Sequence, residues 1–297
     1  MAIPQPTLQQ VGEAAVESLQ RQDWLEPLAE NVQRAVVAAF QAAGETGRRV
    51  RDFLHGTWLG HPLHPVLTDI PLGAWTVAIV LDVKGGRNGH EDRAADAAIG
   101  VGLAGAVGAA VTGLTDWQHT SSDERRLGLV HGLLNISAAT LYATSLALRL
   151  RGARTAGRTI GALGFTVSMG AAYLGGNLVY RKRIGVDHAP RGGWDDFVTA
   201  LPEAELRDSI PQRVDVRGIP VVLIRRGHRI HALADSCAHL GGPLSDGQLD
   251  DVAIRCPWHG SRFALDDGTL LEGPSTFSQP CFEVRVRAGQ IEIRARR

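Results

Sequence analysis

The 297-residue sequence has only three cysteines, all in its last quarter, which excludes a small secreted scaffold held together by disulfides. An excess of one charge is also lacking, because 31 basic residues balance 31 acidic ones, so no nucleic-acid partner is expected. The first residues lack a basic segment followed by an apolar run, and no cleavable signal peptide is predicted. Aromatic residues are few (5%) and glycine is abundant (35 residues), a composition that suits packed membrane helices better than a soluble core.

Four apolar segments lie between residues 66 and 180. Three of them contain no Asp, Glu, Lys or Arg over 19, 22 and 22 positions: 97–115, 127–148 and 159–180. At 1.5 Å per helical residue, each covers roughly the ~30 Å hydrocarbon core of a bilayer. The first segment, 66–83, contains Asp69 and Asp82 and can span only if both carboxylates lie near the interfaces. Because the connections are short, we predict an antiparallel bundle of four membrane-spanning helices. A soluble bundle would need polar helix faces, which the fourth segment lacks.

Outside the bundle the pattern changes twice. Apolar residues at three- and four-residue spacing predict amphipathic helices over 7–43, packed on the rest of the protein or on a membrane surface. After a Gly- and Pro-rich linker, short β-branched runs separated by glycine turns predict a small all-β domain. The fold class is therefore multi-domain, an α-helical four-span membrane bundle plus an all-β domain. The predicted parts are a helical N-terminal region, the bundle, the linker and the β domain: 1–54, 55–187, 188–196 and 197–297.

Two loops of the predicted β domain each contain one cysteine and one histidine. Cys237-Ala-His239 is followed, after sixteen intervening residues, by Cys256-Pro-Trp-His259. Two thiolates and two imidazoles can in principle hold a zinc ion. The motif instead resembles the Rieske family, in which two Cys bind one iron of a [2Fe–2S] cluster and two His bind the other. The resemblance covers roughly 197–297 and includes Gly273-Pro274, which match the proline-containing third loop of that family.

The resemblance implies one Rieske-type [2Fe–2S] cluster per chain. Its metal ligands would be Cys237, His239, Cys256 and His259. Ser261 matches a serine that donates a hydrogen bond to a cluster sulfur in high-potential members. The mononuclear-iron domain of Rieske oxygenases is not expected in this sequence, and we assign no catalytic residue.

Three departures from the respiratory members of the family indicate a ferredoxin-type module. Gly242 and Trp258 stand where those members carry two further cysteines, so the disulfide beside the cluster cannot form. Phe263 stands where a hydrogen-bonding tyrosine is usual. Fewer hydrogen bonds to the cluster destabilise its reduced form, so we expect a reduction potential of about −150 to 0 mV, at the lower end of the family's range.

The predicted membrane half also has a resemblance. The segments His61-Pro-Leu-His64-Pro and Gly175-Gly-Asn-Leu-Val-Tyr180 resemble an uncharacterised bacterial family of four-helix membrane domains, over about 55–187. In a four-span topology, five ionisable residues lie near the membrane face that carries the β domain: His61, His64, Asp69, Asp116 and His131. Such clusters at helix ends mark functional sites, and we predict a redox-active ligand there, haem b or a quinone. Alternatively, these residues only cap helices and reach the interface.

Together the motifs predict a membrane-anchored Rieske iron–sulfur protein that carries single electrons between a membrane-side donor or acceptor and a redox partner protein or reductase. Two alternatives remain: a quinone- or haem-linked membrane oxidoreductase, and a redox sensor. The expected location is the bacterial inner (cytoplasmic) membrane, as a multi-pass protein in contact with lipid. The distribution of basic residues slightly favours a Rieske domain that faces the cytoplasm.

Overall fold

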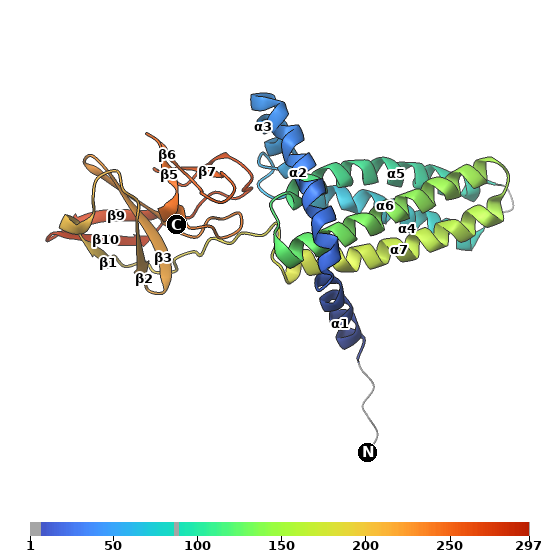
Figure 1. Ribbon diagram of the computed structural model, residues 1–297, viewed down its shortest axis with the longest axis horizontal. Coiled ribbons are helices and arrows are strands. Elements are labelled where there is room, and N and C mark those ends of the chain that lie inside the picture. The colour runs from blue at the N-terminus through green and yellow to red at the C-terminus, as the bar shows by residue number, and fades with distance from the viewer. Residues whose placement is uncertain (1–6, 86–88, 297) are drawn as a thin grey trace, which may run out of the picture. The chain divides into compact units, whose positions relative to one another are not determined.

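The computed structural model describes residues 7–85 and 89–296. The chain forms two compact units. The first comprises Met1–Gly47 and Leu63–Arg183, and the second comprises Arg48–Pro62 and Ile184–Arg297. Helices build the first unit, whereas antiparallel strands build most of the second (Figure 1).

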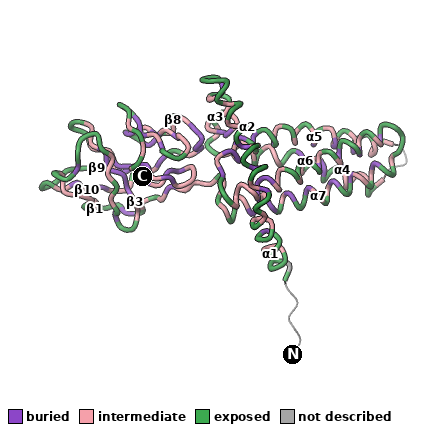
Figure 2. The backbone as a smooth tube through the Cα atoms, in the orientation of Figure 1, coloured by how far each residue is buried: buried purple, intermediate pink, exposed green. Residues whose placement is uncertain are grey.

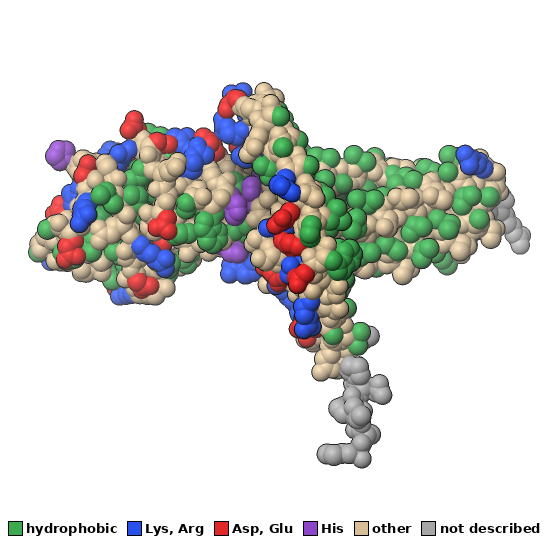
Figure 3. Space-filling model, in the orientation of Figure 1, with side chains coloured by type: hydrophobic (Ala, Val, Ile, Leu, Met, Phe, Trp, Pro, Cys, Tyr) green, Lys and Arg blue, Asp and Glu red, His purple; other side chains and the backbone are tan. Residues whose placement is uncertain are grey.

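The described residues form seven α-helices, of which four are long and apolar enough to cross a membrane. The helices are α1 (Leu8–Gln20), α2 (Glu26–Ala42), α3 (Gly44–His55), α4 (Leu63–Lys84), α5 (His90–Trp117), α6 (Ser122–Leu150) and α7 (Arg154–Tyr180). Helices α4 to α7 run side by side as a bundle (Figure 1). Between 17% and 28% of each apolar window is buried inside the protein. Most of the bundle backbone is exposed or half-buried, and apolar side chains cover much of its visible surface (Figures 2 and 3). This pattern is typical of helices whose outer faces meet lipid.

Small residues allow the bundle helices to approach closely. Trp75 of α4 stacks on Tyr142 of α6, with ring centroids 4.2 Å apart. A Cβ at Gly102 would lie 2.2 Å from the Trp75 ring, and a Cβ at Gly164 would lie 3.2 Å from Tyr142. The aromatic pair therefore occupies space that glycines on α5 and α7 leave free.

Charged residues gather near the ends of α4 and α6. The Arg149 side chain is fully buried and contacts Asp82 and Asp96. Arg149 Nη1 donates to Asp82 Oδ1 at 2.7 Å, and Arg149 Nε donates to Ser145 Oγ at 3.1 Å. The pairing explains how an apolar helix accommodates Asp82, because a buried carboxylate needs an opposite charge.

Helices α1 and α2 lie across one end of the bundle (Figure 1). On α1, Val16 packs in one apolar cluster with Leu127 and Leu174. On α2, the buried Gln33 side chain donates to the carbonyl of Trp117 at 2.9 Å. The apolar stripe predicted over 7–43 thus packs on the rest of the protein.

The described residues of the second unit form ten strands in three antiparallel sheets. The strands are β1 (Val198–Pro202), β2 (Gln212–Val216), β3 (Ile219–Arg226), β4 (Arg229–Ala234), β5 (Gln248–Leu249), β6 (Ala253–Arg255), β7 (Arg262–Ala264), β8 (Leu270–Glu272), β9 (Phe282–Arg287) and β10 (Gln290–Ala295). The sheet orders are β1-β10-β9, β2-β3-β4 and β5-β6-β7-β8. Their inner faces share one core, in which four successive residues of β3, 221–224, are fully buried. The loops after β4 and β6 carry the Cys–His motifs.

Candidate metal centre

The two Cys–His loops share one backbone pattern. In the first, the N–H of Cys237 donates to the carbonyl of Gly242, and the N–H of Gly241 donates back to Cys237, both at 2.8 Å. In the second, Cys256 donates to Ser261 at 2.8 Å, and Gly260 donates back to Cys256 at 3.1 Å. Gly241 and Gly260 have φ of +79° and +83°, which favour glycine. Each loop therefore closes tightly around its cysteine.

These loops bring the two thiols together in the interior. Cys237 is 1% exposed and Cys256 is 3% exposed. A hydrogen bond with the Cys237 thiol lowers the pKa of Cys256 to about 7, whereas the same contact raises the pKa of Cys237 well above its ordinary value. A Cβ at Gly242 would lie 3.0 Å from the Cys256 sulfur, so glycine keeps the space beside the thiols open. Thiolates are the form that binds metals.

The two motif histidines also form a pair. The ring centroids of His239 and His259 are 5.1 Å apart, and the ring planes cross at 88°. Burial, then repulsion from His259, His55 and His188, lowers the pKa of His239 well below its ordinary value. Burial likewise lowers the pKa of His259. Both rings are thus held neutral, and neutral imidazole is the form that binds metals.

The separation of the two rings fits coordination of one metal. With a metal–nitrogen bond of about 2 Å, the centre of an imidazole ring lies about 3.2 Å from the metal. Two rings on a tetrahedral metal then have centres about 5 Å apart, in agreement with 5.1 Å. Among residues 7–85 and 89–296, no group of three or more His, Cys, Asp or Glu is placed to hold one ion. The donors therefore form two separate pairs, which suits a two-metal cluster better than one zinc ion.

The third loop, residues 273–280, holds the first two in place. The backbone N–H of Ser275 donates to the buried Ser261 hydroxyl oxygen at 2.9 Å. Gln279 is 2% exposed and accepts from the N–H of Ala238 at 2.9 Å. Its amide donates at 2.7 Å to the carbonyls of Ala234 and of Ser236. Sequence reasoning missed Gln279, because a single glutamine in a loop has no distinguishing pattern.

Residues 48–62 pack against the third loop within the same unit. A Cβ at Gly273 would lie 3.0 Å from both Asp52 Oδ1 and Thr57 Cγ2. Arg48 contacts the neighbouring Glu272 at 3.6 Å. His55 is 2% exposed and close enough to His239 to affect its pKa. Residues far from the β strands in sequence thus cover one side of the candidate centre.

The second loop has an open edge. Trp258 is 57% exposed, and its ring centroid lies 6.3 Å from that of His259. The adjacent Pro257 is also exposed, whereas His259 and His239 are half-buried. Cys281 lies outside this arrangement and is half-buried, with its sulfur accepting from Arg296 Nη1 at 3.5 Å.

Of the five ionisable residues predicted at one membrane face, His64 and His131 meet in the first unit. Their ring centroids are 6.3 Å apart. Asp69 is exposed on α4, and Asp116 is half-buried in the last turn of α5. His61 is exposed and belongs to the second unit.

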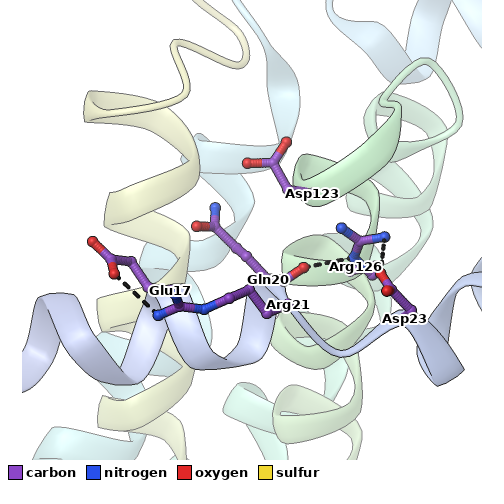
Figure 4. Close-up of a pocket in the computed structure, with 6 residues that line it drawn as sticks. All are labelled: Glu17, Gln20, Arg21, Asp23, Asp123 and Arg126. Atoms are coloured by element: carbon purple, nitrogen blue, oxygen red, sulfur yellow. Dashed lines mark hydrogen bonds and ion pairs between the residues drawn. The ribbon is translucent and has the colours of Figure 1, made fainter.

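A surface pocket of about 570 Å³ lies elsewhere on the helical unit (Figure 4). Its lining residues come from α1, the following turn and α6: Glu17, Gln20, Arg21, Asp23, Asp123 and Arg126. Arg21 points toward Glu17 at 3.2 Å, and Arg126 contacts Asp23 at 3.2 Å. These charges pair with one another, and the pocket contains none of the predicted site residues.

Two family models match separate parts of the chain. The Rieske [2Fe-2S] domain matches residues 196–283, and a model described as a predicted membrane protein (DUF2231) matches residues 60–188. The matches cover the two regions in which the sequence motifs were found.

Several characterised proteins are similar to part of the chain. It is 35% identical to ferredoxin CarAc of Metapseudomonas resinovorans over 78 residues, which are 26% of this chain and 73% of that protein. It is 31% identical to the 3-phenylpropionate/cinnamic acid dioxygenase ferredoxin subunit of Escherichia coli (strain K12) over 97 residues, 32% of this chain and 91% of the subunit. It is 33% identical to apoptosis-inducing factor 3 of Mus musculus over 91 residues, 31% of this chain, and spans only 15% of that protein. The solved ferredoxin of carbazole 1,9a-dioxygenase from Nocardioides aromaticivorans IC177 superposes with a TM-score of 0.33 at 24% identity, covering 34% of this chain and 100% of that one.

Proposed function

The chain belongs to the Rieske [2Fe–2S] family through residues 196–283, and on this premise we propose that it is a membrane-anchored carrier of single electrons. The observation that carries the proposal is the arrangement of four donors as one thiol pair and one imidazole pair, with imidazole centres 5.1 Å apart. Cys237 and Cys256 would bind one iron, and His239 and His259 would bind the other. When bound, the cluster supplies a site that accepts and releases one electron at a time.

The residues around the donors have separate tasks. The Ser261 oxygen accepts from the backbone of Ser275, so its own O–H is the group left to donate to a cluster sulfur. Gln279 fixes the first loop to the third. Phe263 is fully buried and offers no donor. The Ser261 hydroxyl can therefore stabilise the reduced cluster. A tyrosine in place of Phe263 would add a second hydrogen bond.

The open edge determines where a partner would dock. Because residues 48–62 cover the side near His239, the accessible route passes over Trp258 and His259. Exposed aromatic residues are favoured at protein interfaces. We propose that a reductase and an electron-accepting protein use this edge in turn, as expected for a chain similar to ferredoxin subunits of dioxygenase systems.

The helical unit would anchor the carrier. Its four apolar helices would cross the bacterial inner membrane in contact with lipid, with the Rieske domain on the cytoplasmic side. The predicted parts 1–54, 55–187, 188–196 and 197–297 remain our proposal for the domain boundaries. The main alternative, a haem- or quinone-linked oxidoreductase, requires a ligand in the bundle, and the contact between His64 and His131 favours it over a redox sensor.

The test uses the full chain purified from membranes in mild detergent. We expect two irons and two acid-labile sulfides per chain, and hyperfine coupling from histidine nitrogens in the reduced protein when histidine is labelled with ¹⁵N. His259→Ala should remove the cluster, whereas His228→Ala, at an exposed turn of the same unit, should retain it. Stoichiometric zinc without iron, or a reduced cluster without nitrogen coupling, would overturn the proposal.

Docking is tested on the same preparation. Trp258→Ala should slow electron transfer to a protein acceptor without changing the reduction potential. Trp24→Ala removes another exposed tryptophan (71%) from the helical unit and serves as the matched control. Equal rates for the Trp258 variant and the native chain would show that partners do not use this edge.

A further inference from the structure

The bundle contains two helical hairpins, α4–α5 and α6–α7, in which several residues recur at corresponding positions. His64 and His131 are 67 positions apart, as are Trp75 and Tyr142. On the second helix of each hairpin, the pattern Gly-Ala-Ala-x-x-Gly occurs at 108–113 and again 62 positions later, at 170–175. Each hairpin therefore places a histidine and an aromatic residue at corresponding depths.

The contacts repeat as well as the residues. His64 Nδ1 lies 2.8 Å from the carbonyl oxygen of Ala109, and His131 Nδ1 lies 2.8 Å from that of Ala171. A Cβ at Gly113 would lie 2.8 Å from the His64 ring. A Cβ at the corresponding Gly175 would lie 3.0 Å from the His131 ring. Each imidazole thus packs against a glycine of the partner helix and is hydrogen-bonded to a carbonyl of that helix.

Corresponding residues of the two hairpins meet in the bundle. Trp75 stacks on Tyr142, and His64 faces His131 at 6.3 Å with ring planes at 88°. In a two-fold arrangement, corresponding residues that touch one another lie on opposite sides of the symmetry axis, which passes between them. The two histidines therefore mark a point on an approximate two-fold axis of the bundle.

The hydrogen bonds give both imidazoles the chemistry of metal ligands. A backbone carbonyl can only accept, so each Nδ1 carries the proton, and the lone pair remains on Nε2. A ligating histidine almost always donates its other ring N–H in this way. The amide nitrogen of the exposed Asn135 lies 3.2 Å from Nε2 and 3.5 Å from Nδ1 of His131, so it lies beside the ring and not along the Nε2 lone pair.

The ring separation indicates the kind of centre. By the same geometry that gives about 5 Å for a tetrahedral metal, two imidazoles on opposite sides of one metal have ring centres about 6.4 Å apart. The measured 6.3 Å is close to this value, whereas the cluster pair at 5.1 Å is not. The described residues offer no third His, Cys, Asp or Glu for a single ion here. A centre that takes two opposed ligands from the protein must bring its other ligands with it.

We propose that His64 and His131 are the two axial ligands of one haem iron, held on the approximate two-fold axis of the bundle. The porphyrin supplies the four remaining nitrogens, which accounts for a site with only two protein donors, and bundles of this kind build cofactor sites from facing helices. The proposal goes beyond electron transfer by the cluster domain and does not depend on it.

The test is haem binding by the full chain, expressed with iron and a haem precursor and purified in mild detergent. We expect about one haem per chain by the pyridine haemochrome assay. The oxidised protein should give a low-spin EPR signal of the strongly anisotropic type that perpendicular axial imidazoles produce. His64→Ala and His131→Ala should each lower the haem content at least tenfold, and His90→Ala, at the exposed start of α5, should leave it unchanged as the matched control.

A second variant separates ligation from folding. His64→Met keeps an axial donor, so haem should be retained with a changed reduced spectrum and a raised potential. A native chain that takes up no haem on titration, or that contains copper in place of haem, would overturn the proposal. Retention of haem by both alanine variants would do the same. The iron and sulfide of the cluster, measured on each sample, report separately on the proposed function.

Discussion

The two units hold their histidines by different means. In the β unit, His239 and His259 lie on loops whose shape is fixed by backbone hydrogen bonds and by glycines at positive φ. In the helical unit, His64 and His131 lie on regular helices and are oriented by a carbonyl of the next helix. The first arrangement depends on residues close together in sequence and leaves a compact motif. The second depends on residues 40 or more positions apart and leaves only a long spacing.

The comparison implies that the stability of the helical unit depends on a few buried polar contacts. The largest effect is expected for Arg149→Met. The side chain is fully buried, and its loss leaves Asp82 and Asp96 without their shared partner. We expect a loss of about 3–5 kcal/mol in unfolding free energy, measured by denaturant titration in micelles. Arg151→Met, at an exposed position, should change the unfolding free energy little. Equal losses for the two variants would show that the buried pairing does not stabilise the bundle.

In the β unit, the corresponding test is Gln279→Ala. The substitution leaves the N–H of Ala238 and two carbonyls buried without their partner, at a cost of about 1–3 kcal/mol. Iron should also leave the cluster faster, because the first loop loses its hydrogen bonds to the third loop. Release of iron to a chelator measures the effect. Gln248→Ala, at an exposed position of β5, is the control and should release iron at the native rate.

A smaller effect is expected from adding one hydrogen-bond donor near the cluster. Phe263→Tyr should raise the reduction potential by a few tens of mV, because one added hydrogen bond contributes about 0.5–1.5 kcal/mol to the reduced form. Redox titration followed by EPR measures it. Phe282→Tyr adds the same hydroxyl where the ring stacks on Trp194, away from the motif loops, and should leave the potential unchanged. A native potential well above +200 mV would contradict the low-potential prediction.

The smallest expected effect concerns the turn at Asp267. Hydrogen bonds from the backbone N–H of Thr269 and then from its hydroxyl lower the pKa of the Asp267 carboxyl. A lowered pKa stabilises the fold at pH values above the ordinary carboxyl pKa of about 3.9, and the benefit is lost as the pH falls through the folded value. Asp267→Asn should therefore be slightly less stable than the native chain at pH 7 and equal to it in strong acid. Denaturant titration of both chains at each pH measures the difference.

The sequence predicted the two-part fold and both family relationships, and these are confirmed. The cluster loops could be predicted because thiol and imidazole donors at fixed short spacing are rare by chance. The residues at which helices begin and end could not be predicted from the apolar segments, because polar turns extend a helix beyond its apolar span. The segment without charges at 97–115 became α5, which begins at His90.

Long-range contacts could not be predicted in the same way. Nothing in residues 48–62 indicates that Asp52 packs on Gly273, because neither residue type has a preferred partner at that distance in sequence. The five-residue membrane-face site was assembled by topology alone, and the contact between His64 and His131 depends on helix rotation, which charge-free segments do not fix. The repeated Gly-Ala-Ala-x-x-Gly pattern was present in the sequence and could have indicated the correspondence between the two hairpins.

The ion pair between Asp82 and Arg149 has a consequence for self-recognition. The two residues are also 67 positions apart, so they occupy corresponding places in the two hairpins and carry opposite charges. If the first hairpins of two chains paired with each other, aspartate would face aspartate, and two second hairpins would bring arginine against arginine. Such like-charge contacts are strongly unfavourable in an apolar interior. The bundle is therefore selective for unlike halves, which disfavours pairing of like hairpins from neighbouring copies.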